Sequence, residues 1–308
     1  MSNELKENFT VEPTFLAEKN EHGRDKDMQF VESTHKYTIV TDPDSKYDSV
    51  TTWNHSHFAH FNAALIIKNM MKGKNWNPEN KYWGMTAEEI KKKWSTDGLK
   101  AASLGTALHY AIECFMNRDE LTDEASTTDP TNQMVYKSES SVYASPEWSY
   151  FLEFTREFPD LKPYRTEWRI YDEDIKMAGS IDMVYENDDG TLSIYDWKRC
   201  KEISKTNAFK KHAKTKCINY LPDTNFWHYS LQLNTYKAIL ERKYGKIIKD
   251  LYLVQLHEEN PRKTFELIKC ADLSREIEKL FELRKVGFMK VEEVKVEAIK
   301  EVKVEVNV

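Results

Sequence analysis

Glycine is scarce in this chain, with nine in 308 residues, and no group of them forms a glycine-rich loop. Enzymes that act on small phosphorylated molecules commonly cradle the phosphate in such a loop, because glycine lets the backbone approach closely. The scarcity makes a hydrolase of small phosphorylated molecules the least favoured of the functions considered below.

Cysteine is also rare, and its four copies are scattered without a C-x-x-C pair: Cys114, Cys200, Cys217 and Cys270. Disulfide frameworks and structural zinc sites both depend on closely spaced cysteines. The pattern argues against both, and it predicts a reducing, intracellular compartment.

Long apolar runs are missing as well. No stretch approaches the roughly 18 to 20 apolar residues of a membrane span, and the opening MSNELKENFT has no apolar signal segment. We therefore expect no membrane partner and no secretion, with the protein in the cytosol or nucleus. A net charge of −6 argues against coating nucleic acid by bulk attraction, but it leaves room for a local basic groove.

Apolar and aromatic residues, at 40% and 12% of the chain, are plentiful enough for a folded globule. Composition predicts a flexible N-terminal arm (1–25), a single domain (26–288) and a low-complexity Lys/Val/Glu tail (289–308). Within the domain, the acidic, Ser/Thr-rich residues 118–145 are expected to form an exposed insertion.

Hydrophobic periodicity predicts a mixture of helices and strands. The expected helices cover 57–72, 86–94, 99–117, 146–158, 225–245 and 272–288. The expected strands cover 163–172, 176–186, 191–198 and 250–257, and residues 28–40 are expected to form a short hairpin or an edge strand. Several strands are apolar on both faces, which is typical of a sheet covered by helices.

The hairpin over 176–198 contains the first candidate site. Asp188-Asp189-Gly190 predicts a three-residue turn, which fixes the pairing because opposed residue numbers then sum to 378. The opposed residues are Val184 and Ile194, Asp182 and Asp196, and Ser180 and Lys198. All six are expected on one buried face, where two facing carboxylates require a cation or proton between them. The alternatives are an exposed ribbon with solvated carboxylates, and a one-residue register slip that separates the pair.

A helix offers further ligands, because Gly105, His109 and Glu113 lie four residues apart on one stripe. His109 and Glu113 stand among apolar side chains, so they need partners there. One interpretation is a core histidine bonded to a backbone carbonyl. The other is a site rich in oxygen ligands with at most one imidazole, which suits Mg²⁺ or Mn²⁺.

Two further segments extend this pattern. Gln232 and Tyr236 lie one helical turn apart and can reach a common ligand. Residues 198–216 contain eight Lys or Arg and one Glu. Such a run is usually a solvated loop, but directly after Lys198 it would place cations where a phosphate backbone passes.

In order and spacing, G-x-x-x-H-x-x-x-E, Asp182, D-W-K at 196–198 and Q-x-x-x-Y resemble the PD-(D/E)XK nuclease superfamily. The RecB-like and lambda-exonuclease-like branch, which includes single-domain versions in phages and large DNA viruses, looks closest. The resemblance covers about residues 100–240, and FVESTHKYTI and SVTTW resemble segments that precede the core in some members. Ile181 replaces the proline of the superfamily's name.

The resemblance implies an α/β restriction-endonuclease-like core, with a central mixed β-sheet flanked by helices, in a nuclease domain over 26–288. It implies a metal held by Glu113, Asp182 and Asp196, with His109 and the main-chain carbonyl of Trp197 as further ligands. Lys198 would orient or activate the attacking water. Supporting or substrate-binding roles would fall to Gln232, Tyr236, Glu167, Ser180, Arg199 and Lys201.

The expected function is therefore a Mg²⁺- or Mn²⁺-dependent deoxyribonuclease, in particular an exonuclease of DNA recombination, repair or replication, acting inside a host cell if viral. DNA is the expected partner, RNA is not excluded, and a homo-oligomer or a recombination partner is possible. The cysteines lack the spacing of relatives that bind an iron–sulfur cluster, so no cluster is predicted. The alternative is a catalytically silent nucleic-acid-binding or assembly protein with the same fold.

Overall fold

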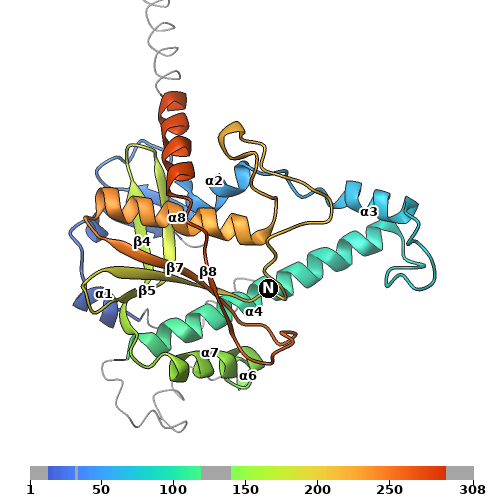
Figure 1. The fold of residues 1–308 in the computed structure, drawn as a ribbon, viewed down its shortest axis with the longest axis horizontal. Helices are drawn as coiled ribbons and strands as arrows, with labels where there is room; N and C mark the ends of the chain where they lie inside the picture. Colours follow the sequence, from blue (N-terminus) through green and yellow to red (C-terminus); the bar gives the residue numbers. More distant parts are fainter. Residues whose placement is uncertain (1–12, 32–33, 119–139, 289–308) are drawn as a thin grey trace, which may run out of the picture.

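The computed structural model describes residues 13–31, 34–118 and 140–288, and it centres on a six-stranded mixed sheet (Figure 1). The strands of this sheet are β3 (Asp48–Ser49), β4 (Lys162–Asp172), β5 (Met177–Glu186), β6 (Leu192–Lys198), β7 (Ile248–Gln255) and β8 (Glu266–Lys269). A separate antiparallel hairpin consists of β1 (Met28–Val31) and β2 (Lys36–Ile39).

Helices cover both faces of the sheet. The labelled α-helices are α1 (Phe15–Lys19), α2 (Val50–Ser56), α3 (Ala63–Lys72), α4 (Ala87–Met116), α6 (Ser140–Tyr143), α7 (Pro146–Glu157) and α8 (Asn225–Lys243). A last helix covers 274–288. The predicted α/β class, with a central mixed sheet flanked by helices, is confirmed.

The strand order is β3-β5-β6-β7-β8, with β4 paired along the other edge of β5. β3 runs parallel to β5 and β6 parallel to β7, whereas the β4–β5, β5–β6 and β7–β8 pairs are antiparallel. β5 therefore contacts three strands. Its last residues pair with β6, and its first residues pair with β3.

Each face of the sheet has its own apolar core. On one side, Val184 and Ile194 belong to a buried cluster with Leu231 and Leu240 of α8. On the other side, Met183 and Trp197 belong to a cluster that includes α4 and α7 residues such as Leu108 and Phe151. The site described below lies where β5 and β6 separate between these two layers.

Helix α4 is longer than predicted, because the two helices expected over 86–94 and 99–117 are one helix of 30 residues. A capping box between Thr86 and Glu89 starts it, and neither a proline nor a cap interrupts the stretch between. The helix is buried at Ile90 and again from Leu108 onward. Between Lys91 and Thr106 it is largely exposed, so the prediction of a mostly buried helix is wrong for that part.

Helix α3 and the first half of α4 project sideways from the body of the molecule (Figure 1). They are held together by a small core of Ile67, Tyr82 and Ile90. The indole of Trp94 donates a hydrogen bond to the Tyr82 hydroxyl at 2.8 Å. The projection has its own packing and is attached to the body through α4 and through residues 57–62, which connect α2 to α3.

The predicted N-terminal arm differs from the structure over the described residues 13–25. Leu16 is buried, and its N–H donates to Asn117 Oδ1. Asp25 accepts bonds from Arg165 at 2.7 Å and from the Trp168 indole at 3.0 Å. This segment is therefore packed on β4 and α4, because its polar side chains satisfy buried partners. Residues 1–12 lie outside the described residues.

The other predicted extensions fall largely outside the described residues, namely 119–139 of the expected insertion and the tail over 289–308. The part of the insertion that the structure describes contains α6, where Val142 is buried, so residues near 142 belong to the core. Among the described residues, no helix combines the length and apolar character needed to cross a bilayer.

Candidate metal centre

The predicted hairpin register is confirmed where β5 and β6 pair. Met183 faces Tyr195 and Val184 faces Ile194, so the opposed numbers sum to 378. The ladder stops there, one pair before Asp182 and Asp196. Because β3 pairs only with residues 177 and 178 of β5, residues 179–182 have no strand partner along that edge. Here the main-chain N–H of Trp197 donates to Asp182 Oδ2 at 3.1 Å. A carboxylate thus replaces a backbone acceptor in the gap.

The prediction that Ser180, Asp182 and Val184 share one face is wrong. Ile181 packs with the same cluster as Val184, whereas Met183 lies in the opposite cluster, so side-chain alternation breaks at Asp182. The reason lies on β4. Glu167 has a φ of +41°, and the Glu167–Asp182 pair is missing from the β4–β5 ladder, which has a second irregularity between Pro163 and Arg165. This irregularity frees the Asp182 carboxylate to turn toward α4.

Three side chains from three elements converge at this irregularity. One potential ligand atom each from His109 on α4, Glu167 on β4 and Asp182 on β5 lies within 4.8 Å of the others. Two ligands on opposite sides of a Mg²⁺ ion are about 4.2 Å apart, so small side-chain rotations would close the set around one ion. Carboxylates with one imidazole form a donor set suited to Mg²⁺ or Mn²⁺.

The contacts of His109 support this use. Its Nε2 lies 2.9 Å from the carbonyl oxygen of Trp197, which can only accept, so Nε2 carries the proton. In the neutral imidazole, Nδ1 then presents a lone pair to Asp182 Oδ2 at 3.5 Å. A lone pair facing a carboxylate requires a proton or a cation between them. The Trp197 carbonyl, expected to face the metal, instead orients the imidazole as carbonyls do for metal-binding histidines.

Glu167, which converges with His109 and Asp182, has a pKa that is shifted by its surroundings. Burial, followed by the nearby charge of Asp182, raises the pKa of Glu167 to about 7. The charge of Glu113, one turn after His109, also raises the pKa of Glu167. The Ser180 hydroxyl donates to Glu167 Oε2 at 2.8 Å. A divalent cation would relieve this crowding of carboxylates.

Asp196 and Lys198 form a buried ion pair next to the three converging side chains. Their side chains are 2% and 17% exposed, and Lys198 Nζ lies 2.5 Å from Asp196 Oδ2. Burial raises the pKa of Asp196 to about 7. Burial acts to lower the pKa of Lys198, but the charges of Asp196 and Asp182 outweigh it and raise that pKa. Lys198 is therefore a fixed cation beside the carboxylates.

The predicted pair on α8 lies at the same site. Gln232 Nε2 donates to the Tyr236 hydroxyl at 3.1 Å. Burial raises the pKa of Tyr236, and the charges of Asp182 and Asp196 add to that effect. A Cβ on Gly179 would lie 2.8 Å from Cε1 of Tyr236, so glycine is required for this ring to approach β5.

Two predicted substrate contacts are not brought to the site. Arg199 forms an ion pair at 2.8 Å with Glu147 of α7, and both side chains are at most 11% exposed. Lys201 pairs with Glu259 at 2.5 Å on the exposed surface. Arg199 thus anchors the chain after Lys198 to α7, and Lys201 lies in a solvated loop.

Sequence reasoning missed two residues around the site. Tyr229 places its ring 4.6 Å from Lys198 Nζ, and the signal was present because it precedes Gln232 by one helical turn. Asn117, next to the end of α4, donates to Thr166 at 2.7 Å and to the carbonyl of Glu113. No pattern in the sequence points to Asn117, because its partner lies on β4.

A mixed sheet that opens at a group of carboxylates and a buried lysine is consistent with the restriction-endonuclease-like class of folds. Residues 81–305 match the family model described as the PD-(D/E)XK nuclease superfamily. The chain therefore belongs to the PD-(D/E)XK nuclease superfamily. Its members are generally nucleases that use divalent metals, so membership suggests nuclease activity on nucleic acid. No curated protein matches the chain.

Proposed function

We propose that this protein is a Mg²⁺- or Mn²⁺-dependent deoxyribonuclease of the RecB-like branch, acting as an intracellular exonuclease in DNA recombination, repair or replication. One observation carries the proposal. His109, Glu167 and Asp182 converge from three elements beside the buried Asp196–Lys198 pair. A protein that only binds nucleic acid gains nothing from carboxylates gathered where phosphates would approach.

In this proposal His109, Glu167 and Asp182 hold the metal, with Glu113 and Asp196 completing its surroundings. The bound ion would lower the pKa of water and offset negative charge on the phosphate. The Trp197 carbonyl keeps the imidazole oriented, and Asp196 keeps Lys198 charged. Lys198 then orients the attacking water and stabilises charge that develops on the phosphate oxygens. Gln232 and Tyr236 position the substrate backbone.

The second candidate is a catalytically silent nucleic-acid-binding or assembly protein. It would keep the sheet and the apolar cores, but it would have no use for a buried lysine among carboxylates, since burying charges is costly. The retained set of Glu113, Asp182, Asp196 and Lys198 therefore favours the enzyme.

The test incubates purified protein with linear and circular, single- and double-stranded DNA and with RNA, in Mg²⁺, in Mn²⁺ and in EDTA. We expect metal-dependent loss of linear DNA and survival of circles. Asp196→Ala and Lys198→Ala should abolish cleavage. The matched controls are Asp188→Ala and Lys162→Ala, which belong to an exposed ion pair between the β5–β6 turn and the first residue of β4. Intact substrates in both metals would refute the nuclease, and cut circles would refute the exonuclease.

A further inference from the structure

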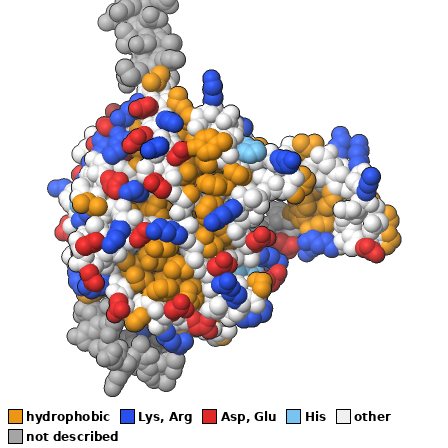
Figure 2. Space-filling model, viewed as in Figure 1, with side chains coloured by type: hydrophobic (Ala, Val, Ile, Leu, Met, Phe, Trp, Pro, Cys, Tyr) orange, Lys and Arg blue, Asp and Glu red, His pale blue; other side chains and the backbone are white. Residues whose placement is uncertain are grey.

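The projecting helices α3 and α4 have a net charge opposite in sign to that of the whole chain. We define the α3–α4 arm as residues 61–104, which comprise α3, the connection after it and the exposed part of α4. The arm contains eight lysines and four acidic residues, a net charge of +4, whereas the whole chain carries −6. The arm therefore carries a net positive charge away from the body of the molecule (Figure 2), as the basic segment 198–216 does elsewhere in the chain.

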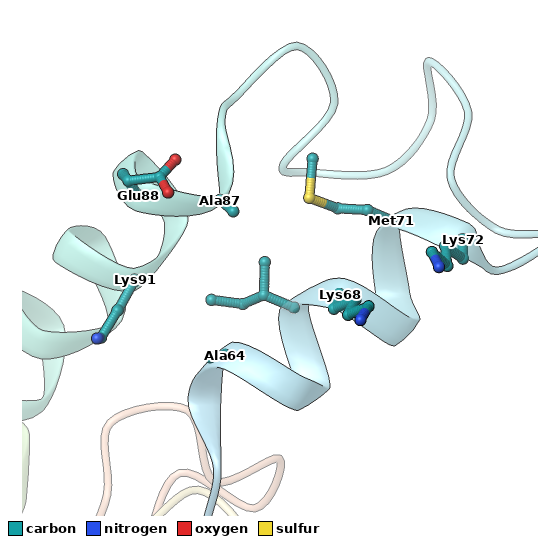
Figure 3. A pocket seen from close by; sticks show the side chains of 8 residues that line it. Ala64, Lys68, Met71, Lys72, Ala87, Glu88 and Lys91 are labelled. Carbon is teal, nitrogen blue, oxygen red and sulfur yellow. The ribbon is translucent and has the colours of Figure 1, made fainter.

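A pocket of about 430 Å³ lies between α3 and α4 on this arm (Figure 3). This volume falls in the range of roughly 300–1,000 Å³ that is typical of small-ligand sites. Apolar side chains and three lysines line it together with a single acid; they include Ile67, Met71, Lys68, Lys72, Lys91 and Glu88. Within the described part of the chain, none of the three lysines forms an ion pair. The pocket therefore combines an apolar surface with three lysines and one carboxylate, an excess of positive charge.

Exposed aromatic rings accompany the lysines. Phe61 is 74% exposed and lies beside Trp94, with ring centroids 6.1 Å apart. Trp83 is 47% exposed and lies beside Trp76, with ring centroids 5.6 Å apart. Lysines interleaved with open aromatic faces are what single-stranded nucleic acid requires, since phosphates bind the cations and unpaired bases stack on the rings.

Helix α4 links this pocket to the candidate metal centre. Lys91 and His109 are 18 residues apart, which is five turns, so both lie on the same face of the helix, about 27 Å apart. The side chains along that face between them are small, namely Ser95, Gly98, Ala102 and Gly105. At about 3.4 Å per nucleotide, a stacked strand covers this distance in about eight nucleotides.

We propose that the α3–α4 arm binds the unpaired strand of the nucleic-acid substrate about eight nucleotides from the metal centre. Lys68, Lys72 and Lys91 contact phosphates, and the apolar floor with Trp83 and Phe61 stacks bases. The inference rests on the proposed function for its substrate class. A duplex keeps its bases stacked internally and gains only the lysine contacts, so the arm favours an unpaired strand.

The test measures binding by fluorescence anisotropy in EDTA, where no cleavage occurs, with a 20-nucleotide single strand and a 20-base-pair blunt duplex. Lys68→Ala/Lys72→Ala/Lys91→Ala should weaken single-strand binding at least tenfold. It should also reduce the slope of log affinity against log salt by about 2, at about 0.7 per lost phosphate contact. Trp83→Ala should weaken single-strand binding by about fivefold or more without changing that slope.

The matched control is Lys36→Ala/Lys46→Ala/Lys279→Ala, which removes three exposed lysines outside the arm and should leave both quantities unchanged. Equal losses on strand and duplex for Trp83→Ala, or no loss of single-strand binding for the triple-lysine variant, would overturn the proposal. So would a changed oligomeric state in light scattering with unchanged DNA affinity, because the arm would then contact a second copy. If nothing is cleaved in Mg²⁺ or Mn²⁺ but the arm variants still lose binding, only the proposed nuclease function fails.

Discussion

Replacing Lys198 by methionine tests whether the cation beside the carboxylates is held by a buried ion pair. The two side chains are 17% and 2% exposed, so methionine would leave Asp196 without its cation in an apolar setting. Removing one partner of a buried pair costs about 3–5 kcal/mol of unfolding free energy. Burial already raises the pKa of Asp196 to about 7. Because protonation of Asp196 removes the charge that Lys198 neutralises, the loss should be smaller at pH 5.5 than at pH 8.

The assay is urea unfolding followed by tryptophan fluorescence in EDTA, at pH 5.5 and pH 8. Lys198→Met/Asp196→Asn should recover most of the stability, since neither charge is then left alone. It should not recover cleavage, because the fixed cation is gone. Lys162→Met, in an exposed pair with Asp188, is the control and should not change the unfolding midpoint. A single variant as stable as wild type at pH 8 would refute this account of the pair.

Three further predictions concern stability. Gly98→Ala, in open space on α4, should stabilise by about 0.5–1 kcal/mol, whereas Gly179→Ala, with a Cβ 2.8 Å from a ring carbon, should destabilise by about 1–3 kcal/mol in the same urea titration. The pKa of Glu167 is raised from 4.5 to about 7, so the folded protein binds more protons and the metal-free protein should lose stability between these pH values. Glu167→Gln should reduce that pH dependence, leaving the share of Asp196, whose pKa is also raised to about 7, and a midpoint that rises with pH in wild type would contradict the assignment. Arg199→Ala should cost about 3–5 kcal/mol by leaving Glu147 buried alone, and an unchanged thermal midpoint would show that the pair has no anchoring role.

Local rules in the sequence predicted much of this fold. The Asp188-Asp189-Gly190 turn and the two-residue period of strands determine the β5–β6 register, because both depend on neighbours in the chain. The same holds for α8, expected over 225–245 and found over Asn225–Lys243. The approach of Gln232 to Tyr236 follows from helical spacing alone.

Features that depend on distant partners could not be predicted in this way. The break in alternation at Asp182 is associated with the backbone of Glu167, on another strand. The N-terminal segment packs because Asp25 meets Arg165 and Trp168, some 140 residues away. Continuity of α4 depends on packing at its two ends, which outweighs the weak helix propensity of its middle. In each case the conformation is determined by tertiary contacts, which local propensity alone does not predict.

The hydrogen bond from the Trp197 amide to Asp182 has a consequence for dynamics. The same carboxylate holds the end of β6 to β5 and, in our proposal, binds the ion. Opening of that end of the sheet and loss of the ion are then thermodynamically linked, so each makes the other easier. Amide hydrogen exchange at Trp197 would report this linkage directly, and added Mg²⁺ should slow it. Asp182→Asn keeps an acceptor for that amide and Asp182→Ala does not, so comparing them separates the architectural role of this side chain from its chemical one.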